Sequence, residues 1–129
     1  MNPDAERWLK QAEYDAGTAE DLYRVSRWAA CVLHAQQSAE KALKALIVER
    51  TNSMPPRRHD IRGLADSVGL LDKLPADALR LSDYYIGVRY PDASDMLPYE
   101  SMDESVAHRC LAAARAVLKL VDSELGSKP

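Results

Sequence analysis

Apolar residues recur every three or four positions between Arg27 and Arg50, in a segment without glycine or proline. This spacing places them on one side of an α-helix, which turns by about 100° per residue. The apolar side carries Trp28, Val32, Ala35, Ala39, Leu43 and Leu46, and the polar side carries His34, Gln37, Lys41 and Lys44. An apolar stripe of this length needs other helices to cover it. We therefore predict a central helix over residues 27–50.

The same periodicity predicts further helices on both sides of this segment. Residues 3–23 form the first, with Asn2 as its cap and Pro3 in its first turn. The link from it to the central helix is so short that the two must pack antiparallel. Residues 60–69 and 76–86 predict two short helices, the first capped by Asp60. Residues 102–125 predict a last long helix, opened by a capping box over residues 101–104.

Two proline-containing stretches, residues 51–60 and 88–100, interrupt the helical pattern and predict loops. No stretch shows the alternation that is typical of a β-strand, and no internal repeat is present. We therefore predict an all-α fold, an antiparallel up-and-down helical bundle of three long helices plus one or two short ones. A chain of 129 residues fits a single domain, here residues 1–129.

Composition excludes several classes of function. The net charge of −3 gives no general attraction to nucleic acid, so such binding would need a local basic patch. Cys31 and Cys110 lie among apolar residues in predicted helices, which indicates buried thiols in a reducing cytoplasm. No signal peptide and no apolar run of membrane-spanning length is visible. The histidines and glycines show neither zinc spacing nor a phosphate loop, so we expect no metal and no cofactor.

Candidate binding chemistry is concentrated at Tyr84, Tyr85, Arg89 and Tyr90, just past a predicted helix end. An arginine can hold a phosphate through two parallel hydrogen bonds, and a tyrosine can stack on a base. Alternatively, Arg89 caps helix carbonyls or pairs with a nearby aspartate, and the tyrosines are packing residues. Both interpretations are compatible with the sequence.

A second basic patch comprises Arg57, Arg58 and His59, on the proline-containing loop before the short helix at residue 60. The start of that helix would favour a phosphate beside these cations. The alternative is a solvated loop in which the next residue caps the helix. Lys41 and Lys44, on the polar side of the central helix, offer either a partner face or a solvated surface.

Three stretches together resemble the HEPN (higher eukaryote and prokaryote nucleotide-binding) domain family. They are WLKQAEYDAGTAEDLY in the first helix, HAQQSAEKALKALIVE in the central helix, and the pair His59–Asp60 followed by YYIGVRYPD at residues 84–92. The resemblance implies an all-α up-and-down bundle that usually forms a homodimer. It also implies a small nucleotidyltransferase partner, and many such relatives are ribonucleases or toxin halves of toxin–antitoxin pairs.

The nuclease relatives implied by this resemblance carry an arginine, four to six residues, and then a histidine. Arg89 matches the arginine, but Ser94, Asp95 and Met96 occupy the positions expected for the histidine. None of the three can exchange a proton near neutral pH as an imidazole does. The ribonuclease motif is therefore incomplete in this chain.

These observations favour a nucleotide- or RNA-phosphate-binding module that acts with a small nucleotidyltransferase partner and has no nuclease activity of its own. One alternative is a metal-independent ribonuclease toxin in which Arg89 acts with His59 or His34. A second alternative is a dimerising scaffold without a ligand. For the first two functions, Arg89 is the residue on which the prediction depends most.

Overall fold

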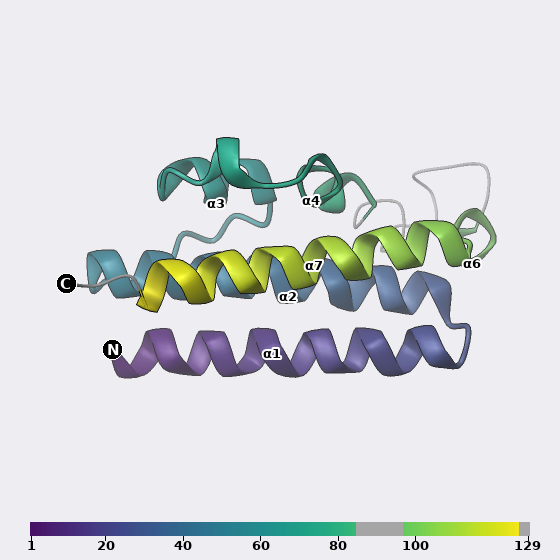
Figure 1. Cartoon of the computed structure of the whole chain (residues 1–129), viewed down its shortest axis with the longest axis horizontal. Coiled ribbons are helices and arrows are strands. Elements are labelled where there is room, and N and C mark those ends of the chain that lie inside the picture. Colours follow the sequence, from purple (N-terminus) through teal and green to yellow (C-terminus); the bar gives the residue numbers. More distant parts are fainter. Residues whose placement is uncertain (85–96, 127–129) are drawn as a thin grey trace.

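The computed structural model describes residues 1–84 and 97–126, which form helices joined by short segments, with no strand among them (Figure 1). The long helices are α1 (Pro3–Arg24), α2 (Trp28–Thr51) and α7 (Glu104–Gly126). The short elements are α3 (Ile61–Ser67), a 3₁₀-helix (Leu71–Lys73), α4 (Ala76–Leu79) and α6 (Pro98–Ser101). The predicted all-α bundle with three long helices is confirmed, and the described residues hold four short elements where one or two were predicted.

The start of α1 follows directly from its first residues. The Asn2 side-chain oxygen accepts hydrogen bonds from the backbone N–H groups of Asp4, at 2.8 Å, and Ala5, at 3.3 Å. These are donors that the first turn of a helix otherwise leaves unsatisfied. At the other end the chain reverses through Ser26, whose φ of 61° lies in the left-handed region. As a result α1 and α2 lie side by side and antiparallel (Figure 1).

Helix α2 is the centre of the molecule, because other elements cover it on nearly all sides. It contacts α1, α3, α6 and α7, and the long axes of α1, α2 and α7 run along one another (Figure 1). Most of the predicted apolar stripe is 1% exposed or less: Val32, Ala35, Ala39, Leu43 and Leu46. Trp28, at the first turn of α2, is instead half-buried, with its ring centroid 5.3 Å from that of Tyr23.

Small side chains line much of the contact between the long helices. The buried alanines of the core cluster include Ala12, Ala16, Ala19, Ala35, Ala39, Ala42, Ala107, Ala113 and Ala114. Small residues allow helix axes to approach closely. Larger side chains complete the core, among them Leu43, Leu46, Ile61, Leu64, Leu70 and Leu81. Burying each of these contributes about 1.5–3 kcal/mol relative to leaving it in water. A single buried cluster therefore joins α1, α2, α3, α4 and α7.

Two predicted helix boundaries differ from the structure. The predicted helix over residues 76–86 is interrupted at Arg80, because α4 ends at Leu79 and helical backbone begins again at residues 81–84. The last long helix does not start from the predicted capping box, because Ser101 already belongs to α6. Asp103 caps α7 instead, and its carboxylate accepts the N–H of Val106 at 2.9 Å. The sequence therefore predicted the right region for the start of α7 but the wrong capping residue.

Cys31 of α2 and Cys110 of α7 are buried free thiols, as predicted. Burial raises the pKa of Cys31 to about 11 and that of Cys110 to about 12. Almost no thiolate is therefore present near neutral pH, and neither side chain is a nucleophile in the folded protein. Within the described residues, no helix is long and apolar enough to cross a membrane.

Candidate functional site

The predicted basic patch lies on the segment between α2 and α3, and its members differ in their contacts. Arg57 is exposed. Arg58 forms a two-point ion pair with Asp60, in which Nε lies 2.6 Å from Oδ1 and Nη2 lies 2.9 Å from Oδ2. The same carboxylate accepts the N–H of Gly63 at 3.0 Å, so Asp60 caps α3 as predicted. The Arg58 guanidinium is therefore already committed to an anion that the chain itself supplies.

The close packing of Arg58 on α3 depends on Gly63. A Cβ atom at this position would lie 2.0 Å from Nη2 of Arg58, which is far inside van der Waals contact. The hydrogen bond from Arg58 is the largest cause that holds the pKa of Asp60 below its usual range. Arg58, Asp60 and Gly63 thus form one local unit that fixes the start of α3.

His59 contacts a buried set of polar residues on α2, namely Gln36, Glu40 and Lys44, which we call the α2 polar cluster. Nδ1 of His59 lies 3.0 Å from Oε2 of Glu40, and Nζ of Lys44 lies 2.9 Å from the same oxygen. Gln36 Nε2 donates to Glu40 Oε1 at 3.3 Å and to the backbone oxygen of His59 at 3.1 Å. Together these contacts offset the cost of burying a carboxylate. They also anchor the segment before α3 onto α2.

The α2 polar cluster contains one buried acceptor without a donor. Oε1 of Gln36 accepts no hydrogen bond from any residue that the structure describes. Turning the amide over would not help, because the two groups beside Nε2 are the carboxylate of Glu40 and the carbonyl of His59, both acceptors. The cluster therefore retains the capacity to accept one more hydrogen bond.

The two lysines predicted to form a partner face do not share an exposed surface. Lys44 is only 5% exposed, with its ammonium on Glu40 and 5.6 Å from the ring centroid of Trp8. Lys41 is more accessible, and its Nζ lies 2.7 Å from Oδ2 of the buried Asp15 on α1. The expectation of a common exposed face was wrong for Lys44, because α2 is covered on its polar side as well. Buried carboxylates compensate both ammonium groups.

The predicted tyrosine–arginine corner is only partly within the described residues. Tyr84 is half-buried and packs against the core. Nearby, the Ser82 hydroxyl oxygen accepts the N–H of Ile61 at 2.8 Å and so connects the helical residues 81–84 to the start of α3. Tyr85, Arg89 and Tyr90 lie outside the described residues, so their roles remain sequence predictions.

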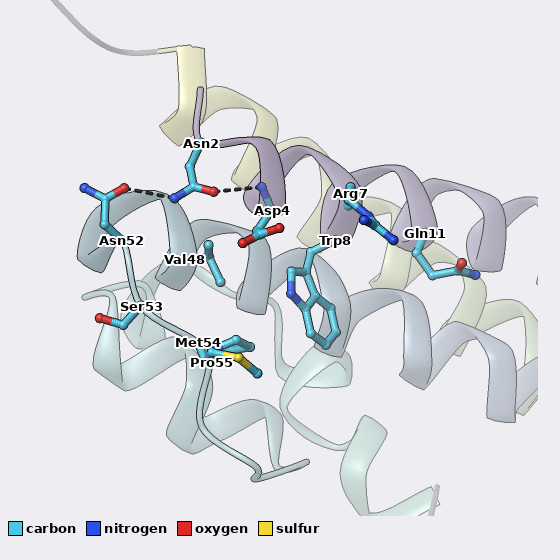
Figure 2. Close-up of a pocket in the computed structure, with 10 residues that line it drawn as sticks. All are labelled: Asn2, Asp4, Arg7, Trp8, Gln11, Val48, Asn52, Ser53, Met54 and Pro55. Atoms are coloured by element: carbon cyan, nitrogen blue, oxygen red, sulfur yellow. Dashed lines mark hydrogen bonds between the residues drawn. The ribbon is translucent and has the colours of Figure 1, made fainter.

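A pocket that the sequence did not indicate lies between the first turns of α1, the end of α2 and the segment that follows it (Figure 2). Its volume is about 550 Å³, within the range of small-molecule sites. In Figure 2 the Trp8 indole extends from α1 on one side of the pocket, with Val48 and Met54 on the other. The lining residues are Asn2, Asp4, Arg7, Trp8, Gln11, Val48, Asn52, Ser53, Met54 and Pro55.

Hydrogen bonds between the first residues of α1 and the end of α2 fix one side of this pocket. Asn2 Nδ2 donates to Asn52 Oδ1 at 2.9 Å (Figure 2). The backbone N–H of Asn2 donates to Glu49 Oε1 at 2.7 Å. Asn52 ends α2 with a left-handed φ of 52°, a conformation that asparagine tolerates well. The hydrogen bond between Asn2 and Asn52, at the rim of the pocket, therefore joins residues that are 50 positions apart in the chain.

Trp8 recurs with the apolar residues of α1 at three- and four-residue steps, which predicts a core position rather than its observed position in the pocket wall. A signal was present, because Asp4 and Gln11, four residues before and three residues after Trp8, are its neighbours on the helix surface. An aromatic residue within a polar helix face indicates partial exposure. The sequence could not show that Met54 and Pro55 form the wall opposite Trp8, because no local pattern connects these residues with it.

The site can provide an aromatic surface, hydrogen-bonding groups and a cation, but its chemistry does not indicate a metal. Among the described residues, no group of three or more His, Cys, Asp or Glu side chains is placed to hold a metal ion. The pocket and the α2 polar cluster meet at Trp8, because Lys44 lies over its ring. The pocket and the buried α2 polar cluster are therefore adjacent.

Comparison with known proteins gives consistent matches over nearly the whole chain. The family model of the HEPN domain matches residues 5–124. The candidate toxin MJ1304 of Methanocaldococcus jannaschii is 28% identical, over 96% of this chain and 90% of that protein. The crystal structure of TT1696 from Thermus thermophilus superposes with a TM-score of 0.84 at 29% identity, covering 96% of this chain and 99% of that one. The crystal structure of ST0689, an archaeal HEPN homologue, gives a TM-score of 0.73 at 28% identity, covering 94% and 97%.

Proposed function

Because this chain belongs to the HEPN domain family, we propose that it is a nucleotide- or RNA-phosphate-binding module of a toxin–antitoxin-type pair. In this proposal it acts with a small nucleotidyltransferase partner and has no nuclease activity of its own. The observation that carries the proposal is the family match over residues 5–124, together with likeness to a candidate toxin over 96% of the chain. The proposed function thus depends on similarity over the whole domain. The experiments must identify which residues bind phosphate.

Among the candidate phosphate ligands, Arg89 is the first to test. Arg58 is held by Asp60, and His59 by Glu40, so both would have to exchange an existing partner for a phosphate. Arg89→Ala should weaken binding of a labelled single-stranded RNA by about tenfold to a hundredfold, the range for a charge-assisted two-point contact. Arg89→Lys should recover only part of this, since an ammonium lacks the planar fork.

The matched control for this experiment is Arg24→Ala, which removes an exposed arginine that pairs with Asp21 at the end of α1. It should leave RNA affinity unchanged when measured by fluorescence anisotropy at one fixed salt concentration. Unchanged affinity in Arg89→Ala, with a lowered melting temperature, would show that Arg89 is a structural cap. The scaffold alternative would then be favoured.

The proposed partner is tested separately. Co-expression of this chain with a small nucleotidyltransferase encoded beside it should yield a complex that co-purifies through an affinity tag on either protein. Co-purification that persists at high salt would indicate a specific interface rather than charge attraction. Absence of a complex, when both proteins are folded, would refute the two-component part of the proposal and leave RNA binding to be judged on its own.

We also propose that the chain forms a homodimer, as the family resemblance implies. A specific interface should bury more than about 1,200 Å² in total. Sedimentation at tens of micromolar should show a species of twice the 14.4 kDa chain mass. A 14.4 kDa species at all these concentrations would refute this part.

The Glu40–His59 contact favours a second candidate function, the metal-independent ribonuclease. A buried carboxylate 3.0 Å from Nδ1 fixes an imidazole whose side chain is 63% exposed, an arrangement that suits a general base. In that reaction His59 would take the proton of a ribose 2′-hydroxyl, the 2′-oxygen would bond to phosphorus, and the bond between phosphorus and the 5′-oxygen would break. The 5′-oxygen would leave with that electron pair and take a proton from water. His34 is less suited, because its Nδ1 is buried and accepts or donates no hydrogen bond among the described residues.

The two candidates make opposite forecasts for RNA cleavage in the presence of a metal chelator. Under the main proposal the wild-type protein leaves a labelled RNA intact. Under the ribonuclease alternative the wild-type protein cleaves it, His59→Ala abolishes cleavage, and His34→Ala retains it. Cleavage that both variants retain would come from a contaminating nuclease and would leave the main proposal in place.

A further inference from the structure

We propose that the pocket of Figure 2 binds a nucleobase, which stacks on Trp8 while its phosphate pairs with Arg7. This inference deepens the proposed function, because it assigns the nucleotide a specific site that lies away from Arg89 in the sequence. The pocket volume of about 550 Å³ is sufficient for one nucleotide, with room for bound water.

Trp8 provides the stacking surface. It is half-buried in the wall of the pocket, and Figure 2 shows its ring separated from Met54 and Val48 by the hollow. Lys44, whose ammonium lies 5.6 Å from the ring centroid, is not among the residues that line the pocket. The ammonium therefore does not occupy the part of the indole that borders the pocket. A base that stacks there would contribute on the order of 1–3 kcal/mol, the range for aromatic–base contacts.

Met54 and Pro55 make the opposite wall suitable for a planar ring. Met54 is 85% exposed, so its apolar side chain is accessible to a ligand. The proline limits the backbone freedom of this wall, and Asn52 holds the start of the segment to Asn2. A flat heterocycle between Trp8 and Met54 would cover apolar surface on both of its faces.

The charges on the rim select a ligand with few phosphates. Arg7 is exposed and forms no ion pair within the described part of the chain, so its guanidinium can pair with a phosphate. Asp4 lies on the same rim and would repel a run of several phosphates. The rim therefore favours a nucleoside monophosphate, or one nucleotide of a single-stranded RNA, over a nucleoside triphosphate.

The amide groups of the rim add hydrogen-bonding capacity for a base edge. Gln11 donates its Nε2 to Asp15 at 3.0 Å, which leaves its Oε1 as an acceptor. Asn52 accepts from Asn2 through Oδ1, which leaves its Nδ2 as a donor. Figure 2 shows the two amides at opposite ends of the pocket, so a base that stacks on Trp8 would use at most one of them.

Tryptophan fluorescence tests this inference directly. The chain has two tryptophans, Trp8 and Trp28, so the Trp28→Phe variant leaves Trp8 as the reporter. Adenosine 5′-monophosphate should quench this emission in a saturable manner. Ribose 5-phosphate, which has the same phosphate and sugar but no base, should leave it unchanged at equal concentrations. Equal quenching by both compounds would overturn the stacking role of Trp8.

Arg7→Gln in the same background should weaken the binding of adenosine 5′-monophosphate about tenfold, because a charge-assisted contact is lost. The matched control is Lys10→Gln, which makes the same change of charge on the same helix at a residue outside the pocket. Equal affinities in Arg7→Gln and Lys10→Gln would overturn the phosphate contact. Trp8→Ala is a weaker test, because Lys44 packs over this ring and the variant could lose stability.

The outcome is separable from that of the proposed function. RNA binding that depends on Arg89, without any response of Trp8 fluorescence or any effect of Arg7→Gln, would refute the pocket and leave the RNA-binding module intact. If adenosine 5′-monophosphate quenches the emission and Arg89→Ala does not change RNA affinity, the nucleotide site in the pocket is supported and the Arg89 proposal is refuted. No quenching at millimolar nucleotide and no RNA binding would refute both.

Discussion

Two buried regions of α2 lie next to each other in the sequence but are stabilised in different ways. One is the apolar core around Leu43, which is fully buried among alanines, leucines and valines. The other is the α2 polar cluster, in which Glu40 is 8% exposed and Lys44 is 5% exposed. Each apolar group that the core removes from water adds to stability, almost regardless of which apolar residues surround it. The polar cluster is stable only when every charge has its partner.

This difference has a structural consequence for the segment that precedes α3. The His59 side chain is 63% exposed, yet polar contacts bind this residue to Glu40 and to Gln36. The core therefore provides stability, whereas the polar cluster determines where a specific loop lies. Because this loop also supplies Met54 to the pocket wall, the cluster positions one side of the candidate site.

The largest effect should come from removing the shared carboxylate of the polar cluster. Glu40→Ala leaves the buried Lys44 ammonium without a counter-ion and should lower the free energy of unfolding by about 3–5 kcal/mol. Urea unfolding followed by circular dichroism measures this, with the exposed Glu13→Ala as control. A loss below about 1 kcal/mol would show that the cluster is open to water and that its stability does not depend on pairing every charge.

Truncating the apolar core should have a slightly smaller effect. Leu43→Ala removes a side chain that is 0% exposed and should cost about 3 kcal/mol, from lost burial and the cavity left behind. Leu43→Met, which nearly conserves volume, should cost less than about 1.5 kcal/mol. Equal losses in the two variants would indicate that this position is constrained by shape rather than by apolar burial.

Replacing both charges at once should separate stability from positioning. The double variant Glu40→Leu/Lys44→Met removes the buried pair without leaving a lone charge, so its stability should lie within about 1 kcal/mol of the parent. His59 would lose its carboxylate partner, and limited proteolysis within residues 52–60 should become faster. Protease resistance equal to that of the parent would show that the cluster does not position this segment.

The smallest expected effect concerns acid stability. Asp60 has a pKa held below its usual value of 3.8, chiefly by Arg58, so the unfolded chain takes up its proton first as the pH falls. This contribution to stability is present above pH 3.8 and is lost as the pH falls through the lowered value. Because the pair is exposed, its contribution is small. We expect Asp60→Asn to reduce the loss of unfolding free energy in acid by only about 0.5 kcal/mol.

Urea midpoints at pH 5 and pH 3 would measure this difference in the parent and the variant. Asparagine also caps helices well, so Asp60→Asn changes the charge while keeping the cap. Asp72→Asn, at an exposed aspartate in the 3₁₀-helix, is the matched control. An identical acid response in all three proteins would show that solvent screens the Arg58–Asp60 pair completely.

The sequence by itself determined features that depend on neighbours along the chain. The apolar repeat set the extents of α1 and α2 to within one residue of those observed, and Asn2 and Asp60 were identified as caps. These are local effects, since a helix face repeats every three to four residues and a cap bonds to N–H groups within three residues. The all-α class followed from them.

Only the tertiary structure decided which polar residues are buried and what they contact. Lys44 looked like a surface residue because it shares a side of the helix with His34, Gln37 and Lys41. Glu40, Trp8 and the cover of α1 place it inside. The contact of Glu40 with His59 joins residues 19 positions apart. The pocket needs Asn2 and Asn52 to meet across the ends of two helices. Burial of a charge depends on partners that packing brings together from distant parts of the chain, and no local pattern specifies them.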